Sequence, residues 1–231
     1  MLARLEMAPG LVLLEIGCGD GNFFPVYAPV LGPGGRLIGL DVNSALLDQA
    51  LAKARLLGIR AEGIVWDFDS HPYPLSDSEV DYVIAPFSAY YSRDITAWLN
   101  DCLRVLKPGG TMLLIGPASG NAPELYDLNL AVTGIRTIAE TEETSTKLEA
   151  GFLPELRRRQ DVKVESTLVS RELVFPDAEE FARYYLATWL YEKTAEKIAK
   201  RISFDDVVKA AASANLRLTK SVICIEAKKR S

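Results

Sequence analysis

The chain has 231 residues, 48% of them hydrophobic and 25% charged, which fits one soluble globular domain with a sizeable core. Its formal net charge is −5 and its pI is near 5.1, so a nucleic acid or an anionic membrane held by charge alone is not expected as a partner. Two basic clusters, at 157–159 and 228–230, are short and are interpreted as solvated surface.

The first half of the chain alternates short apolar strands with amphipathic helices. Ahead of the first strand, residues 1–10 have room for at most a turn or two of helix. Strands are predicted over 12–16, 36–40, 59–66, 79–85 and 111–116, and helices over 23–31, 44–57 and 94–106. Glycine-rich turns lie at 32–35 and 107–110. These short connections imply right-handed crossovers and a parallel sheet covered on both faces.

Beyond residue 117 the alternation is less regular. The polar segment 140–160 has few apolar anchors, so we interpret it as a mobile lid. Helices are predicted over 122–138, 177–191 and 204–214, and strands over 162–174 and 216–227. The two late strands are expected to finish the sheet as an antiparallel pair. Four aromatic residues are interpreted as packing on the sheet rather than as a substrate lid: Tyr184, Tyr185, Trp189 and Tyr191.

Cysteine usage and the N-terminus bear on the compartment. The three cysteines, Cys18, Cys102 and Cys224, show no C-x-x-C spacing, so neither a disulfide framework nor a metal site is predicted. The N-terminus carries no signal pattern, and no apolar run approaches membrane-spanning length. We therefore expect a reduced, cytoplasmic protein that does not act at a membrane.

The stretch V-L-L-E-I-G-C-G-D-G-N, over 12–22, carries the strongest functional signal. Its apolar run stops at three alternating glycines, which is typical of a buried strand that enters a tight turn. Such glycines tolerate positive φ and let a ligand lie against the backbone, while the following helix directs N–H groups toward it. A dinucleotide fingerprint needs its third glycine at 22, where the chain has Asn22.

Five segments resemble one known family. They are E-I-G-C-G-D-G at 15–21, G-L-D-V-N at 39–43, W-D-F at 66–68, D-Y-V-I-A at 81–85 and L-R-V-L-K-P-G-G at 103–110. In this order and spacing they resemble the class I, Rossmann-like S-adenosylmethionine-dependent methyltransferases, specifically the small-molecule type called type 11. The resemblance covers residues 11–116 and, more loosely, the remainder.

The resemblance implies an α/β fold: a doubly wound, mostly parallel seven-stranded sheet with an antiparallel C-terminal strand and helices on both faces. Residues 1–231 would then form a single methyltransferase domain, in which 117–160 is the lid or substrate-binding region. The implied cofactor is S-adenosyl-L-methionine, which leaves as S-adenosyl-L-homocysteine.

Two acidic positions near the glycine turn are candidates to hold this cofactor. The family pattern places Glu15 on the side of the methionine ammonium, whereas a structural carboxylate that pairs with N–H groups of the turn is the alternative. Asp41 ends the second strand about twenty residues after the turn, where a carboxylate can accept hydrogen bonds from both ribose hydroxyls. A helix N-cap is its weaker alternative, because Asn43 and Ser44 can serve there.

The adenine and the rest of the ligand would meet further residues. Asp67 would accept from the exocyclic amine, or else is a plain polar strand end, and Trp66 or Phe68 would form an apolar wall. The Ala85 carbonyl would lie near the methionine group. The residues expected to bind the cofactor are Glu15, Gly17, Cys18, Gly19, Gly21, Asp41, Val42, Asp67, Phe68 and Ala85.

The methyl acceptor is expected at the loop after the fourth strand, at the carboxyl ends of the strands. Its candidates are Phe87, Ser88, Tyr90 and Tyr91, of which the two tyrosines either orient the acceptor or are plain wall residues. No general base is indicated, since the only histidine, His71, is interpreted as a surface residue. The loop lacks the N-P-P-Y pattern and has no Pro-Cys nucleophile.

These observations favour a methyltransferase that transfers a methyl group to a small-molecule acceptor by in-line displacement. One alternative is a methyltransferase that acts on RNA or protein. Another is a protein that binds S-adenosylmethionine without turnover. The sequence predicts neither the acceptor and its methylated atom nor the oligomeric state.

Overall fold

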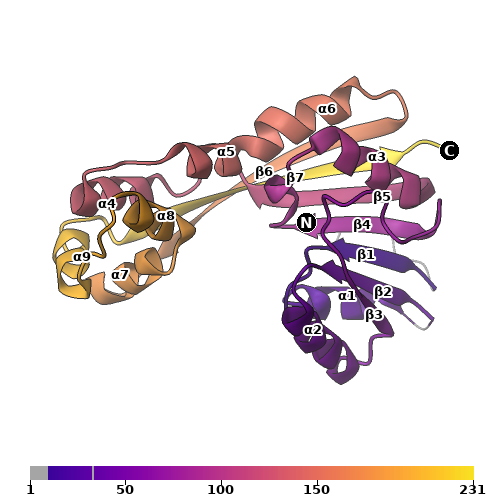
Figure 1. The fold of residues 1–231 in the computed structure, drawn as a ribbon, viewed down its shortest axis with the longest axis horizontal. Helices are drawn as coiled ribbons and strands as arrows, with labels where there is room; N and C mark the ends of the chain where they lie inside the picture. The colour runs from indigo at the N-terminus through magenta and orange to yellow at the C-terminus, as the bar shows by residue number, and fades with distance from the viewer. Residues whose placement is uncertain (1–9, 33) are drawn as a thin grey trace. The chain divides into compact units, whose positions relative to one another are not determined.

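The computed structural model describes residues 10–32 and 34–231, so the expectation for 1–9 and the Pro33 position of the 32–35 turn lie outside the described residues. Seven strands form one sheet in the order β3-β2-β1-β4-β5-β7-β6 (Figure 1). They are β1 (Val12–Ile16), β2 (Arg36–Asp41), β3 (Ala61–Val65), β4 (Val80–Pro86), β5 (Leu106–Pro117), β6 (Val162–Val174) and β7 (Arg217–Lys229).

The sheet confirms the predicted fold class. Parallel pairing joins β1 to β2 and β4, β2 to β3, and β4 to β5, whereas β7 runs antiparallel to β5, and helices surround the sheet. The helices are α1 (Phe24–Leu31), α2 (Ser44–Leu56), α3 (Ile95–Val105), α4 (Pro123–Thr133), α5 (Ala139–Lys147), α6 (Leu153–Arg158), α7 (Ala178–Leu186), α8 (Trp189–Lys197) and α9 (Phe204–Ala211). In the part of the chain described, no helix has the length and apolar character needed to cross a membrane.

The chain divides into two compact units. Unit 1 comprises Met1–Gly116, Leu148–Thr167 and Ile223–Ser231, and unit 2 comprises Pro117–Lys147 and Leu168–Val222. The long strands β6 and β7 therefore each contribute residues to both units. The division also falls inside the predicted lid of 117–160. The single methyltransferase domain and its lid stay predictions.

In unit 1, helix α2 packs on a pair of glycines in the sheet. Asn43 caps the helix, because its side chain accepts from the N–H groups of Ala45 and Leu46. Gly39 of β2 and Gly63 of β3 lie opposite each other in register. A Cβ at Gly63 would approach the Leu47 side chain to 2.8 Å, so the missing side chain is what lets α2 lie close to the strands.

The residues after 147 are better anchored than their polarity suggests. A π-helical turn, η3 (Leu148–Phe152), precedes α6, and Leu148, Phe152 and Leu156 are fully buried. The Phe152 ring meets Trp98 of α3 edge-on, at 5.4 Å between ring centres. Although the segment 140–160 is mostly polar, its second half is thus anchored in unit 1 by a few buried hydrophobic side chains.

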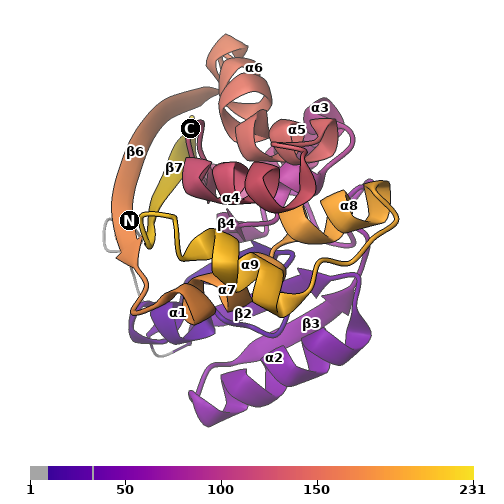
Figure 2. The same ribbon diagram turned by 90° about the vertical axis from the view of Figure 1, so that its left-hand side faces the viewer.

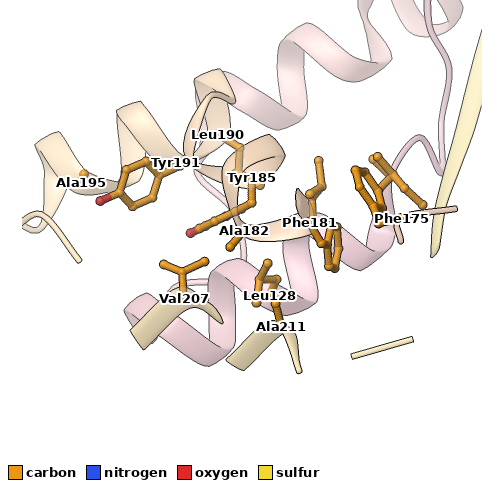
Figure 3. Packing of buried hydrophobic residues seen from close by; sticks show 13 residues of the cluster. Leu128, Phe175, Phe181, Ala182, Tyr185, Leu190, Tyr191, Ala195, Val207 and Ala211 are labelled. Atoms are coloured by element: carbon orange, nitrogen blue, oxygen red, sulfur yellow. The ribbon is translucent and has the colours of Figure 1, made fainter. Parts of the chain in front are cut away.

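Unit 2 has its own hydrophobic core. Figure 2 shows α4, α7, α8 and α9 grouped together, and Figure 3 shows the side chains that they bury. The core contains Tyr185 and Tyr191, so these two aromatic residues are packed inside the protein, but mainly among the helices of unit 2 rather than on the sheet as expected. The single helix predicted over 177–191 is two helices, because the Thr188 side chain caps α8 by accepting from Tyr191 N–H.

One buried polar network lies inside this core. Asn129 is completely buried; its amide donates to Thr194 Oγ1 at 3.1 Å and to the Ile135 carbonyl at 2.8 Å. Its Oδ1 accepts from the Tyr185 hydroxyl at 2.6 Å. A buried amide that is satisfied on both ends fixes how α4, α7 and α8 meet.

We predict that Tyr185→Phe destabilises the protein by about 1–3 kcal/mol, because Asn129 Oδ1 loses its donor while it stays buried. Tyr184→Phe is the matched control, since the half-buried Tyr184 hydroxyl meets only Lys220 at 3.3 Å. Urea unfolding of both variants measures the effect. Equal stabilities would show that the network contributes nothing.

Candidate functional site

The glycine turn between β1 and α1 uses its N–H groups within the protein. Gly17 and Cys18 donate to the Leu40 carbonyl at 2.7 and 3.1 Å, and Gly21 donates to the Cys18 carbonyl at 2.9 Å. Gly19 donates to Asp41 Oδ2 at 2.8 Å. These donors are therefore not free to cradle a phosphate, although the turn has the glycines of a nucleotide-binding loop.

The three glycines have positive φ for different reasons. A Cβ at Gly17 would lie 2.5 Å from Ser88 Cβ, and one at Gly21 would lie 2.9 Å from Phe24 and 3.1 Å from Ala50. Gly19, with φ of +53°, has open space where its side chain would be. Gly17 and Gly21 are thus required by packing, whereas the space beside Gly19 is available to a ligand.

Asp41 ends β2 and holds the turn. Its Oδ2 accepts from Gly19 N–H at 2.8 Å and its Oδ1 accepts from Asn43 N–H at 2.9 Å. Each oxygen keeps a further lone pair, so a carboxylate fixed in this way can still accept two hydroxyl hydrogen bonds. Val42, beside it, is 70% exposed, as expected for an apolar side chain that a flat ligand would cover.

Glu15 is buried below the turn. Only 1% of it is exposed, and its Oε2 has no hydrogen-bond partner among the described residues. Burial raises the pKa of Glu15 to about 8; the nearby Tyr27 hydroxyl opposes this rise and the charge of Asp41 adds to it. The Tyr27 hydroxyl, also buried, lies near this carboxyl, and no hydrogen bond of good geometry satisfies it within the part of the chain described. The alternative in which N–H groups of the turn satisfy Glu15 Oε2 gains no support.

The segment after β3 is fixed to the segment before α3. Asp69 accepts from the Ser92 hydroxyl at 2.7 Å, and from the Arg93 main chain and Nε at 3.0 and 2.8 Å. Partial burial acts to raise the pKa of Asp69, yet the hydrogen bonds from Arg93 and Ser92 hold it below its usual value. Asp67, two residues earlier, is exposed, and its Oδ2 lies 3.3 Å from Arg93 Nη2.

The loop after β4 contains the predicted acceptor residues in two groups. Ser88 is buried and donates to the Ile16 carbonyl at 2.5 Å, and Tyr90 is buried against Gly116, so both are structural. Phe87 and Tyr91 are 43% and 52% exposed. Phe87 also has φ of +55°, which is strained for an aromatic residue. The exposed aromatic surface that an acceptor can meet is therefore that of Phe87 and Tyr91.

The remaining candidates, Cys18, Ala85 and Phe68, have buried or half-buried side chains. Cys18 is buried against Gly39, so only its main chain faces the turn. Ala85 is buried within β4 opposite Leu114, and β4 continues one residue past it. Phe68 is half-buried and its carbonyl accepts from the Tyr73 hydroxyl.

Sequence reasoning missed several groups that the fold brings to this region. No sequence motif marks Tyr27, Asp69 or Arg93. Each of them interacts with a residue that is distant in sequence. His71 is not a free surface residue, as its Nδ1 lies 3.0 Å from the buried Asp101 and its side chain is only 19% exposed. Among residues 10–32 and 34–231, no cluster of three or more His, Cys, Asp or Glu side chains has the arrangement of a metal site.

The chain is similar in sequence to known methyltransferases. The family model described as "Methyltransferase domain" matches residues 13–110. The chain is 30% identical over 120 residues to a demethylmenaquinone methyltransferase of Lactobacillus johnsonii, and 32% identical over 133 residues to a malonyl-[acyl-carrier protein] O-methyltransferase of Yersinia pestis. These matches cover 52% and 56% of this chain, but 49% and 45% of the relatives.

A solved structure of an S-adenosylmethionine-dependent methyltransferase from Aquifex aeolicus superposes with a TM-score of 0.56 at 16% identity. The match covers 99% of this chain and 87% of that chain, and it extends the agreement in fold beyond residue 110. The sequence match over residues 13–110 and the shared fold together support a class I S-adenosylmethionine-dependent methyltransferase. The chain spans less than half the length of the two curated relatives.

The residues of this site fit S-adenosyl-L-methionine, the cofactor that these similarities support. The open space beside Gly19, the unpartnered Oε2 of Glu15 and the exposed face of Val42 are features that the protein alone leaves unfilled. Asp41 and Asp67 add acceptors and no cation-repelling group. A ligand with an ammonium, two ribose hydroxyls, an amine and an apolar base face matches this donor and acceptor set.

The buried Glu15 generates a prediction about stability. Unfolded, this carboxyl titrates near 4.5, whereas in the fold it keeps its proton up to about pH 8. Between these values the folded state binds one more proton, so the free energy of unfolding falls as pH rises, by about 1.4 kcal/mol per unit.

In Glu15→Gln, the contribution of this carboxyl to the pH dependence of the free energy of unfolding should disappear. Without cofactor, the variant should therefore gain stability relative to the wild-type protein on going from pH 6 to pH 8. Urea unfolding of both proteins at the two pH values measures the difference. Parallel pH dependences would show that Glu15 ionises normally in the fold.

Proposed function

We propose that this protein transfers the methyl group of S-adenosyl-L-methionine to a small-molecule acceptor. The observation that carries the proposal is the charge character of the glycine turn. Its Gly17, Cys18, Gly19 and Gly21 N–H groups have protein acceptors, and among the described residues the buried atoms below it without a partner are a carboxyl oxygen of Glu15 and the Tyr27 hydroxyl. Such a turn suits a cationic ligand without a pyrophosphate.

In this proposal each carboxylate of the site binds a different part of the cofactor. Asp41, fixed by Gly19 and Asn43, would accept the ribose hydroxyls, and Val42 would cover one face of the adenine. Asp67 would accept from the adenine amine. Glu15, once ionised, would meet the methionine ammonium. Because burial holds Glu15 protonated in the empty protein, binding of the ammonium would be coupled to loss of this proton.

The bound cofactor supplies an electrophilic methyl group on a sulfonium, which reacts by in-line displacement. The task of the protein is then to orient the acceptor and to exclude water from the reacting atoms. Phe87 and Tyr91 supply exposed aromatic surface at the carboxyl end of β4, where the acceptor would lie. Phe87 has no titratable group, and a neutral amine, an enolate or a thiolate acceptor needs no general base.

Further observations support a small-molecule acceptor and a cytoplasmic location. The relatives named above act, by their names, on demethylmenaquinone and on malonyl-acyl-carrier protein. The acidic net charge and the exposed aromatic side chains favour a small organic acceptor over RNA. Cys18, Cys102 and Cys224 are buried, and none of them is in a disulfide among the described residues, which suits the cytoplasm, where we place the reaction.

We predict that Gly19→Ala weakens binding of S-adenosyl-L-homocysteine at least tenfold while the protein stays folded, because the new Cβ meets no protein atom and occupies ligand space. Its positive φ costs about 1–2 kcal/mol of stability. Gly21→Ala is the matched contrast, and should mainly destabilise the protein through Phe24 and Ala50. Calorimetric titration and thermal unfolding separate the two effects.

Asp41→Ala should also lose binding, since it removes the acceptor for the ribose and for Gly19 N–H. If the pure wild-type protein binds neither S-adenosyl-L-methionine nor its demethylated product, the proposal is wrong.

Two further measurements decide among the reactions. Affinity for bulk RNA that falls with salt would move the methyl acceptor to RNA. Cofactor binding without any turnover in the presence of a small-molecule cell extract would point to a binding protein instead of an enzyme. Formation of S-adenosyl-L-homocysteine that depends on the extract supports the proposal.

A further inference from the structure

Asp69 joins two loops that both border the candidate cofactor site. Its side chain is 8% exposed and accepts from Ser92 Oγ, Arg93 N and Arg93 Nε, at 2.7, 3.0 and 2.8 Å. Asp69 lies in the loop after β3. The residues that donate to it, Ser92 and Arg93, lie in the loop between Tyr91 and α3. This cluster of Asp67, Asp69, Ser92 and Arg93 is called the Asp69 clasp below.

The clasp also holds Asp67 in one orientation. Asp67 Oδ1 accepts from Asp69 N–H at 3.0 Å, and Oδ2 faces Arg93 Nη2 at 3.3 Å. The main-chain carbonyl of Asp67 accepts from Ser70 N–H at 2.8 Å, which closes the turn. An exposed aspartate without such contacts would sample several rotamers, whereas here each oxygen has one fixed donor and one free lone pair.

The Arg93 guanidinium pairs with both aspartates of the clasp. Its Nε is bound to Asp69 and its Nη2 to Asp67, although 77% of the side chain is exposed. An exposed ion pair adds little to stability. A guanidinium that bridges two carboxylates in a fixed fork is more useful for orientation, because its planar geometry sets the direction of each oxygen.

We propose that Arg93 and Asp69 are positioning residues that hold Asp67 to read the exocyclic amine of adenine, so that the clasp sets the base specificity of the cofactor site. The inference rests on the proposed function. Asp67 Oδ atoms offer only acceptors, which fit the amine of adenine and oppose the carbonyl oxygen that replaces it in hypoxanthine.

The test compares two ligands that differ at this edge of the base, S-adenosyl-L-homocysteine and S-inosyl-L-homocysteine, by calorimetric titration. In the inosyl ligand a carbonyl oxygen replaces the amine and N1 carries a hydrogen. The wild-type protein should prefer the adenosyl ligand about tenfold or more, as one charge-assisted hydrogen bond allows. Arg93→Gln should reduce this preference to about threefold or less, because Asp67 Oδ2 is no longer held. Asp67→Asn should abolish it, since an amide can also donate to a carbonyl oxygen.

Arg183→Gln in unit 2 is the matched control. Arg183 is likewise exposed, and bridges Glu179 and Glu180, so the variant should keep the wild-type preference. The thermal midpoint of Arg93→Gln should stay near that of the wild-type protein, which separates orientation from folding.

The outcomes distinguish the two claims. If the wild-type protein binds neither ligand, the proposed function fails. If it binds the adenosyl ligand but Arg93→Gln keeps the full preference, or Asp67→Asn does, the clasp does not set base specificity and the inference fails. An equal loss of affinity for both ligands in Arg93→Gln also overturns it, because that result indicates a structural role alone.

Discussion

The candidate site depends on the hydrogen bond from Gly19 N–H to Asp41 Oδ2, which joins the glycine turn after β1 to the end of β2. The turn bends away from its strand with positive φ at three glycines, so its conformation needs support from outside. Leu40 supplies that support through its carbonyl, and Asp41 through its side chain. The same carboxylate is thereby oriented toward the ligand space, so holding the turn and presenting an acceptor are one structural task.

The sequence predicted this part of the site because its signals are local. Glycines that interrupt an apolar strand, and aspartates that directly follow one, can be recognised without knowledge of the fold. Gly19, Asp41 and Asp67 were identified as candidates in this way, and the parallel direction of β1 to β5 was predicted from the alternation of strands and helices. Their roles toward the cofactor stay predictions, since no ligand contact tests them.

The remaining features depend on contacts between distant residues. Ser88 reads as a candidate acceptor residue in the sequence, yet it fastens the β4 loop to Ile16, seventy-two positions earlier. The anchoring of Leu148 and Phe152 is equally invisible, because two or three apolar side chains in a polar segment give no clear period. The separate core of unit 2 was seen only as a run of helices with aromatic residues. In each case the missing information is which surface a side chain meets, and pattern alone does not supply it.

The carboxylates of the site differ in protonation because their surroundings differ. Asp69 is stabilised as an anion by Arg93 and Ser92, whereas Glu15 is buried beside another acid and a tyrosine hydroxyl and keeps its proton to about pH 8. If every carboxylate of the site were ionised, the carboxylates would repel one another as long as no cation is bound. Holding Glu15 neutral in the empty protein removes one charge from the turn. If Glu15 binds the cofactor ammonium as proposed, its carboxylate would form only when this counter-charge is present, and the free-energy cost of an unpaired buried carboxylate would be avoided.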